Sequence, residues 1–216
     1  MNTDIKNNLD QYFREKLEQH GANARGVDWN SEERQRLCFS QILKVCRDSQ
    51  TCAWDQEFSL LDYGCGYGAL AEYLAAEAVP IQEYVGYDLS QPMVEAAREA
   101  KWSLGDRVRF EFEEPIDETF DYVVASGVVA LKLQADESAW KDHVAATIER
   151  IWKMARKGIS FNSLTSYSDA ERMRPDLYYP DPRELFDFCK TRLSRQVALF
   201  HDYGPYEFTI TVRREN

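Results

Sequence analysis

A carboxylate followed by three alternating glycines is the part of this chain best suited to ligand chemistry. Asp62 follows an expected strand that begins at Phe58, and the chain then turns into a helix-like run at 69–78 through Gly64, Gly66 and Gly68. Glycines allow positive φ angles and carry no Cβ that would hold a ligand away from the backbone. The helix start behind them offers unpaired N–H groups to a polar or anionic ligand. The spacing predicts a loop that holds a nucleotide-like cofactor.

A second carboxylate, Asp88, ends the next expected strand at 84–87, about twenty residues beyond the glycines. An acid at this place can accept hydrogen bonds from both hydroxyls of a ribose. The alternative is a turn or capping role before the helix that Pro92 begins, since proline suits a first helical turn. Together with the glycine loop, the spacing favours the ribose role.

Asp62 decides between two cofactors. Gly64, Gly66 and Ala69 also satisfy the loose pattern of dinucleotide-binding loops, so the glycines alone permit NAD. A carboxylate just before the loop would repel an approaching pyrophosphate. It suits instead a cofactor with an ammonium group and a sulfonium, namely S-adenosylmethionine.

The stretch Asp62–Gly68 resembles motif I of the class I S-adenosylmethionine-dependent methyltransferases, and the resemblance extends over about 58–213. It implies a Rossmann-like α/β fold: a seven-stranded, mostly parallel sheet with a reversed last strand, helices on both faces and an N-terminal helical lid. Residues 1–50 would form the lid and residues 51–216 the methyltransferase domain. The C-terminal segments 195–201 and 206–213, separated by a turn at 202–205, match the hairpin that ends the sheet in this family.

The hydrophobic pattern supports this organisation independently. Expected helices alternate with expected strands, which predicts βαβ units and a parallel sheet. The expected helices lie at 4–19, from 31 to about 45, and at 69–78, 137–155 and 182–191, and the expected strands at 58–61, 84–87, 108–112, 120–126 and 159–162. Lys157 and Gly158 are expected to end the long helix.

The resemblance also assigns site residues by position. It implies that Cys65 in the loop, Leu89 after Asp88, and Ser126 and Gly127 after the fourth strand line the cofactor. Glu113 and Glu114 fall where the family often places an acid near the adenine amine, with a solvated acidic turn as the alternative.

Methyl transfer mainly requires that acceptor and methyl group be aligned, and a general base helps where the acceptor is a hydroxyl or an ammonium. His20 and His201 are the candidate bases, although a helix end and an edge strand are their plain structural roles. His143 is expected to be solvated. Trp29, Asn162, Tyr178 and Tyr179 are the candidate acceptor contacts.

Composition limits the partners. The chain has 216 residues, 44% of them hydrophobic, which suits one domain. A formal net charge of −11 disfavours bulk binding to nucleic acid or to an anionic membrane surface. The five cysteines have no C-x-x-C spacing, so neither a metal site nor a disulfide framework is expected, and a reducing cytoplasm is the expected location.

We therefore expect a methyltransferase acting on oxygen, nitrogen or carbon of a small metabolite. A modifier of protein or RNA, and a non-catalytic S-adenosylmethionine-binding subunit, are the alternatives. An NAD-dependent oxidoreductase is disfavoured by Asp62 and by the terminal hairpin. The sequence does not indicate an oligomeric state.

Overall fold

The computed structural model describes residues 3–54, 56–204 and 206–215. Their seven strands form one sheet in the order β3-β2-β1-β4-β5-β7-β6. The strands are β1 Phe58–Tyr63, β2 Ile81–Tyr87, β3 Val108–Glu111, β4 Phe120–Ala125, β5 Ala155–Leu164, β6 Gln196–Phe200 and β7 Glu207–Arg213. Strands β1 to β5 are parallel to one another, whereas β7 runs antiparallel between β5 and β6. The predicted seven-stranded sheet with a reversed last strand is confirmed. Pro205 of the predicted hairpin turn lies outside the described residues.

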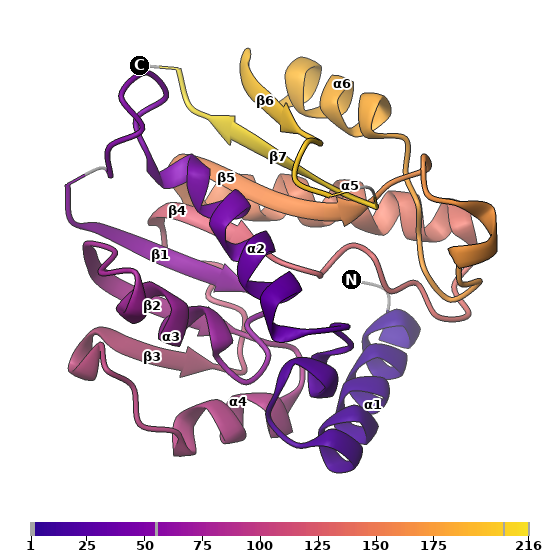
Figure 1. Ribbon diagram of the computed structural model, residues 1–216, viewed down its shortest axis with the longest axis horizontal. Coiled ribbons are helices and arrows are strands. Elements are labelled where there is room, and N and C mark those ends of the chain that lie inside the picture. The colour runs from indigo at the N-terminus through magenta and orange to yellow at the C-terminus, as the bar shows by residue number, and fades with distance from the viewer. Residues whose placement is uncertain (1–2, 55, 205, 216) are drawn as a thin grey trace.

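Helices cover both faces of the sheet (Figure 1). One hydrophobic core contains buried residues of α1, α5 and α6, and the other contains buried residues of α2, α3 and α4. The helices are α1 Thr3–His20, α2 Glu32–Ile42, α3 Ala69–Ala76, α4 Gln91–Glu99, α5 Glu137–Met154 and α6 Pro182–Arg192, with short 3₁₀ turns η1 Ala24–Val27, η2 Leu43–Cys46, η3 Gly105–Arg107 and η4 Ala170–Arg172. Figure 1 shows α1 beyond the arrowhead ends of β1 and β3, where ligands of open α/β sheets bind.

Side-chain caps fix several helix starts. Ser31 accepts a hydrogen bond from the Arg34 amide at the start of α2, and Asp136 caps α5 in the same way. Asp181 caps α6, whose first residue is a proline. These contacts satisfy amides that have no partner inside the helix, and they explain why the predicted starts of these helices agree with the structure.

The junction of α5 and β5 differs from the prediction. The helix ends at Met154 and the chain enters β5 at once, so Lys157 and Gly158 lie in a strand and do not end a helix. A Cβ on Gly158 would lie 2.7 Å from the Val212 carbonyl oxygen of β7. This glycine therefore permits close approach of the neighbouring strand, which is a different use of glycine from a helix cap.

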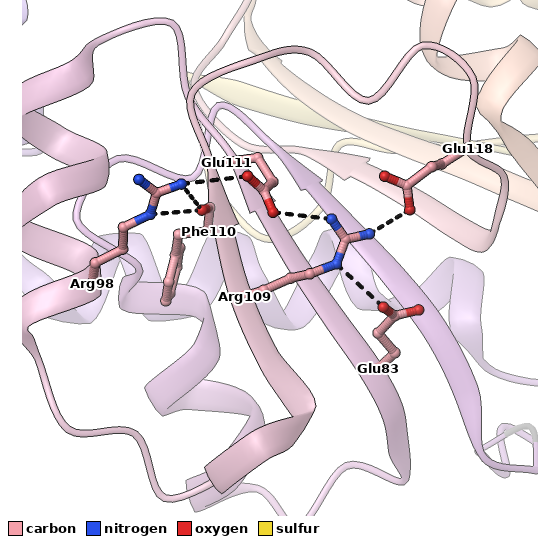
Figure 2. Close-up of polar contacts among 6 residues, drawn as sticks. All are labelled: Glu83, Arg98, Arg109, Phe110, Glu111 and Glu118. Atoms are coloured by element: carbon pink, nitrogen blue, oxygen red, sulfur yellow. Dashed lines mark hydrogen bonds and ion pairs between the residues drawn. The ribbon is translucent and has the colours of Figure 1, made fainter.

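The edge strand β3 is protected by arginines, as Figure 2 shows. Arg98 donates two hydrogen bonds, of 2.9 and 2.6 Å, to the Phe110 carbonyl. Arg109 contacts three carboxylates around the same edge, those of Glu83, Glu111 and Glu118. Charged side chains on an edge strand oppose pairing with a second chain.

Candidate cofactor and acceptor site

The glycine loop is tied to the end of β2. The amides of Gly64 and Cys65 both donate to the Tyr87 carbonyl, at 2.7 and 2.9 Å. Gly64, Gly66 and Gly68 have φ angles of +83°, +54° and +89°, which side chains rarely adopt. Gly68 precedes the first residue of α3. The three glycines thus turn the chain sharply between β1 and α3.

Asp88 connects this loop to the start of α4. Its Oδ2 accepts from the Gly66 amide at 2.8 Å, and its Oδ1 accepts from the Ser90 amide at 2.9 Å. Each carboxylate oxygen can accept more than one hydrogen bond, so a bound hydroxyl can still be accommodated. The local turn and a ligand contact are therefore compatible roles for this buried side chain.

Asp62 lies in the same cavity and is 3% exposed. The Tyr84 hydroxyl donates to its Oδ2 at 2.7 Å. Burial raises the pKa of Asp62 to about 7 and the pKa of Asp88 to about 6, because the charged form loses its hydration. Two carboxylates that are costly to ionise favour a cationic ligand, which would stabilise both of them.

A cavity of about 90 Å³ lies over these groups. Its walls come from the glycine loop, the ends of β2 and β4, the N-terminal segment and α5. The lining residues are Leu9, Phe13, Val27, Trp29, Gln35, Phe39, Asp62, Tyr63, Gly64, Cys65, Gly66, Tyr87, Asp88, Leu89, Met93, Ser126, Gly127, Val128, Leu131, His143 and Thr147. We call this space the first cavity.

The segment after β4 forms a further wall of the first cavity. Gly127 has a φ of +78°, and its amide donates to Asn162 Oδ1 at 2.8 Å. The hydroxyl of Ser126 is buried and has no hydrogen-bond partner among the described residues. This hydroxyl is therefore open to a hydrogen bond with a bound ligand.

A second cavity, of about 670 Å³, adjoins the first. The two share five lining residues, namely Phe13, Val27, Trp29, Gly127 and Leu131. The remaining walls of the second cavity come from the segment that leads into α2, the loop after β4, β5, η4 and its flanking loops, and the start of β7; they include Asp28, Arg34, Asn162, Ser163, Leu164, Tyr179, Tyr206 and Glu207. The shared walls thus place the two cavities side by side.

Comparisons with known proteins identify the family of the chain. A model of the methyltransferase domain matches residues 61–158. "Putative methyltransferase Rv1506c" of Mycobacterium tuberculosis (strain ATCC 25618 / H37Rv) is 48% identical over 157 residues, which are 73% of this chain and 93% of that protein. The chain belongs to the methyltransferase family.

Solved structures confirm the fold of this methyltransferase. Magnesium protoporphyrin IX methyltransferase (ChlM) from Synechocystis PCC 6803, solved with bound SAH, superposes with a TM-score of 0.64 at 14% identity, covering 98% of this chain and 100% of that one. The plantazolicin methyltransferase BpumL, solved with a monoazolic desmethylPZN analog and SAH, gives 0.66 at 11% identity, covering 98% and 96%. The resemblance to class I methyltransferases drawn from motif I is confirmed for family and fold.

The first cavity of the methyltransferase collects most of the predicted cofactor residues. Asp62, Gly64, Cys65, Gly66, Asp88, Leu89, Ser126 and Gly127 all line it. Gly68 does not line it; a Cβ there would lie 2.8 Å from the Trp102 ring, so this glycine allows side chains to pack behind the loop.

The structure does not bring Glu113 and Glu114 into either cavity. Glu113 is exposed. Glu114 accepts from the Tyr63 hydroxyl and from Arg150, each at 2.9 Å. Glu114 therefore holds Tyr63, which itself lines the first cavity. The family pattern did not indicate this hydrogen bond or the contact with Arg150.

The two predicted bases also lie outside both cavities. His20 is exposed at the end of α1, where its carbonyl accepts from the Asn23 side chain. His201 follows β6 and packs against Tyr167 and Phe208, with ring centroids 6.0 and 5.9 Å apart. Their plain structural roles, a helix end and an edge strand, account for their positions.

The predicted acceptor contacts divide in a similar way. Trp29 lines both cavities, and Asn162 and Tyr179 line the second. Tyr178 lines neither; it is buried, and its amide donates to the Ala130 carbonyl at 2.7 Å. It holds the loop after β4 in place.

Sequence reasoning missed two residues of α5 that line the first cavity. His143 was expected to be solvated, but it is half-buried, with its ring centroid 4.8 Å from that of Trp140. Burial lowers its pKa to about 4, so the imidazole is neutral at physiological pH. Thr147 lies one turn further along the same face. His143 and Thr147 are spaced i, i+4, and the large apolar Trp140 lies three residues before His143. This spacing was the signal in the sequence that the three residues share one inward face of α5.

Within the described residues, no group of three or more His, Cys, Asp or Glu side chains is arranged to hold a metal ion. None of the described helices has both the length and the apolar character needed to cross a membrane. All five cysteines are free thiols.

Proposed function

We propose that this methyltransferase uses S-adenosylmethionine to methylate oxygen, nitrogen or carbon of a small metabolite. The observation that carries the proposal is the pair of buried carboxylates, Asp62 and Asp88, facing one cavity at the carboxyl ends of the parallel strands. A second cavity with shared walls adjoins it. This arrangement offers one compartment to a cationic cofactor and one to an acceptor.

The residues of the first cavity fit S-adenosylmethionine. Asp88 would hold the ribose hydroxyls, Asp62 would face the ammonium end, and the unpartnered Ser126 hydroxyl provides a further polar contact. When bound, this cofactor supplies an activated methyl group on a positively charged sulfur. Gly64, Cys65, Gly66, Leu89 and Gly127 would form the surrounding contact surface, and Gly68 would shape the turn.

The second cavity would bind the acceptor. Its volume of about 670 Å³ falls in the range of ~300–1,000 Å³ typical of small-ligand pockets. Trp29, Asn162 and Tyr179 would contact the acceptor there, and the wall shared with the first cavity would align it with the methyl group. A small metabolite is favoured because this pocket is bounded by the N-terminal segment on one side and the η4 region on the other. Free thiols are consistent with the reducing cytoplasm that we propose as its location.

Calorimetry with S-adenosylmethionine, S-adenosylhomocysteine and NAD tests the cofactor. We expect heat of binding with the first two and none with NAD, because a pyrophosphate would face Asp62 and Asp88. Binding of NAD alone would contradict the proposal. A thermal shift series measures the same binding in a second way, since a ligand present at a hundredfold its Kd adds about 2.7 kcal/mol to the free energy of unfolding.

Two other functions remain distinguishable from this one. A modifier of protein or RNA would methylate a macromolecule in a cell extract supplied with radiolabelled cofactor. A non-catalytic subunit would bind the cofactor but release no S-adenosylhomocysteine with any acceptor. The second cavity favours catalysis over a non-catalytic role, since a partner subunit needs no separate acceptor pocket. The enclosure of this cavity between the N-terminal segment and the η4 region favours a small molecule over a macromolecule as the acceptor.

A further inference from the structure

The second cavity contains a carboxylate that no sequence motif indicated. Glu207 is the first residue of β7 and lines this cavity, with its side chain 14% exposed. Its Oε2 forms an ion pair with Arg34 at 3.0 Å and accepts a hydrogen bond from the Cys38 thiol at 2.9 Å. Burial, reinforced by the Glu207 charge, raises the pKa of Cys38, so the thiol stays protonated and remains a donor. Among the described residues, none donates a hydrogen bond to Oε1.

Glu207 is linked to the wall that the two cavities share. Gly127 of that wall donates to Asn162 Oδ1 at 2.8 Å. Asn162 lies in β5, and this strand pairs with β7, where Leu164 lies opposite Glu207. The paired strands thus connect the edge of the first cavity with the carboxylate in the second, and they set the position of Glu207 relative to the proposed cofactor.

The other carboxylate that lines the second cavity, Asp28, is held by a cation at each of its oxygens. Asp28 Oδ1 is bound by Lys16 at 2.9 Å, and its Oδ2 by Arg174 at 3.2 Å. Glu207, by contrast, forms an ion pair with one arginine, Arg34, through Oε2, and its Oε1 has no donor among the described residues. No histidine is among the residues that line the second cavity. Of the two carboxylates that line this cavity, Glu207 is therefore the one with an oxygen that has no donor among the described residues.

We propose that Glu207 accepts the hydrogen bond, and then the proton, of an acceptor that attacks through a hydroxyl or an amine. This inference rests on the proposed function. The oxygen or nitrogen lone pair forms the bond to the methyl carbon while the methyl–sulfur bond breaks, and its electron pair stays on sulfur as the neutral thioether. The O–H or N–H bond breaks, and its proton goes to Glu207 Oε1. Arg34 and Cys38 are positioning residues that hold Oε2 and leave Oε1 free.

The apolar walls narrow the acceptor further. Phe13, Trp29, Leu131, Leu164 and Leu177 surround the same space. Aromatic and aliphatic walls beside a carboxylate with an open oxygen suit a planar apolar body that carries a single proton-donating nucleophile. We therefore assign phenols and aromatic amines as the acceptor class.

The test uses Glu207→Gln with Glu77→Gln as a matched control. Glutamine keeps an oxygen that can accept from Arg34 and Cys38 but cannot take up a proton. Glu77 is paired with Arg36 of the same helix α2 that carries Arg34, and it lines neither cavity. The probes are a panel of phenols and aromatic amines, each with its methyl ether or its fully N-methylated amine. Release of S-adenosylhomocysteine and calorimetric binding are measured for each.

We expect wild type and Glu77→Gln to turn over members of the panel at similar rates. Glu207→Gln should lower kcat about 10²- to 10⁴-fold, the range typical of a lost general base, and keep an unchanged affinity for S-adenosylhomocysteine. It should also weaken binding of the proton-donating probes relative to that of their methylated counterparts. The relative rates of phenols and amines then identify which of the two is the nucleophile.

Several outcomes overturn the assignment. If Glu207→Gln keeps the wild-type kcat, Glu207 is not the general base. The same conclusion follows if the substitution weakens binding of the proton-donating and the methylated probes equally. If the wild-type protein binds the cofactor but neither binds nor turns over any member of the panel, phenols and aromatic amines are not its acceptors. Failure of wild type to bind S-adenosylmethionine contradicts the proposed function itself, which keeps the two failures separate.

Discussion

Asp62 and Asp88 face the first cavity with only hydrogen-bond donors to balance their charges. Tyr84 serves Asp62, and the amides of Gly66 and Ser90 serve Asp88. Neither carboxylate forms an ion pair among the described residues. Burial therefore raises the pKa of both, and the free protein holds charges that are costly without a ligand. A positively charged ligand would offset this cost.

The affinity for S-adenosylmethionine should therefore depend on pH. Because both pKa values exceed those of an unfolded chain, the folded free protein holds protons up to a pH of about 6 to 7. Their contribution to the free energy of unfolding thus falls as the pH rises from about 4 to about 7. A cationic ligand prefers the ionised pair, so affinity should rise over pH 5.5 to 8, by about tenfold per pH unit for each proton released. Calorimetry over that range measures it.

Asp62→Asn is the variant that isolates one of the two groups. With an amide in place of this carboxylate, the pH dependence should become shallower, and the remaining change should centre near a pH of about 6, the pKa of Asp88. A wild-type affinity that is constant from pH 5.5 to 8 would show that neither carboxylate meets the charged part of the ligand.

Asp88→Ala should weaken binding of S-adenosylmethionine by about 1–3 kcal/mol, because the ribose hydroxyls lose their acceptor. The loop should loosen as well, since the amides of Gly66 and Ser90 lose the same partner. Calorimetry on Asp88→Ala and on the exposed control Asp106→Ala separates the ligand contact from a general effect of charge. Equal affinities in both variants would remove the ribose assignment, and thermal midpoints report the loss of loop stability.

At the scale of elements, the N-terminal segment limits access to the first cavity. The cavity measures about 90 Å³, less than the ~300–1,000 Å³ that small-ligand pockets usually have. Leu9 and Phe13 of α1 and Trp29 after η1 form part of its wall. We therefore expect α1 and its neighbouring turn to move outward when a nucleoside enters, as the predicted lid would.

Phe13→Ala should make that entry easier. Truncating the ring removes apolar bulk from the cavity wall, so the association rate of S-adenosylhomocysteine should rise, by up to about tenfold. Stopped-flow tryptophan fluorescence follows the reaction, and Glu15→Ala, an exposed position on the same helix, is the control. Association rates equal to wild type in Phe13→Ala would show that the ligand enters without displacing this part of α1.

The elements show where sequence reasoning succeeds and where it stops. The glycine loop and Asp88 were predictable because the turn and its chemistry lie within one βαβ unit. The α5–β5 junction was mispredicted because Gly158 serves the strand beside it, which is remote in sequence. Glu207 was missed for the same kind of reason: it contacts Cys38, which lies 169 positions away. Local spacing indicates local contacts, whereas the second cavity includes residues of β5 and β7, which only strand pairing brings together.

For the whole molecule, charge decides which acceptors can approach. The chain carries a formal net charge of −11. The arginines that line the second cavity are paired with acids: Arg34 with Glu207, Arg174 with Asp28 and Asp176, and Arg172 with Asp169. Cations that already have partners contribute little attraction to a phosphate backbone, because binding would first break those pairs. The electrostatic basis for nucleic-acid binding is therefore weak.

We accordingly expect no binding to bulk tRNA at about 0.15 M salt, and no transfer of methyl label to it. A gel-shift titration with the cofactor-loaded enzyme measures the first, and incorporation of label measures the second. Binding by unpaired phosphate contacts would appear as an affinity that falls steeply with salt, so the titration is repeated at about 0.05 M. Saturable binding at the higher salt, with label in the RNA, would mean that a local surface overcomes the net charge of −11, and the acceptor would then be a macromolecule. Binding that appears only at the lower salt, without label in the RNA, is compatible with a small-molecule acceptor. Such salt-sensitive attraction to a polyanion occurs without methyl transfer.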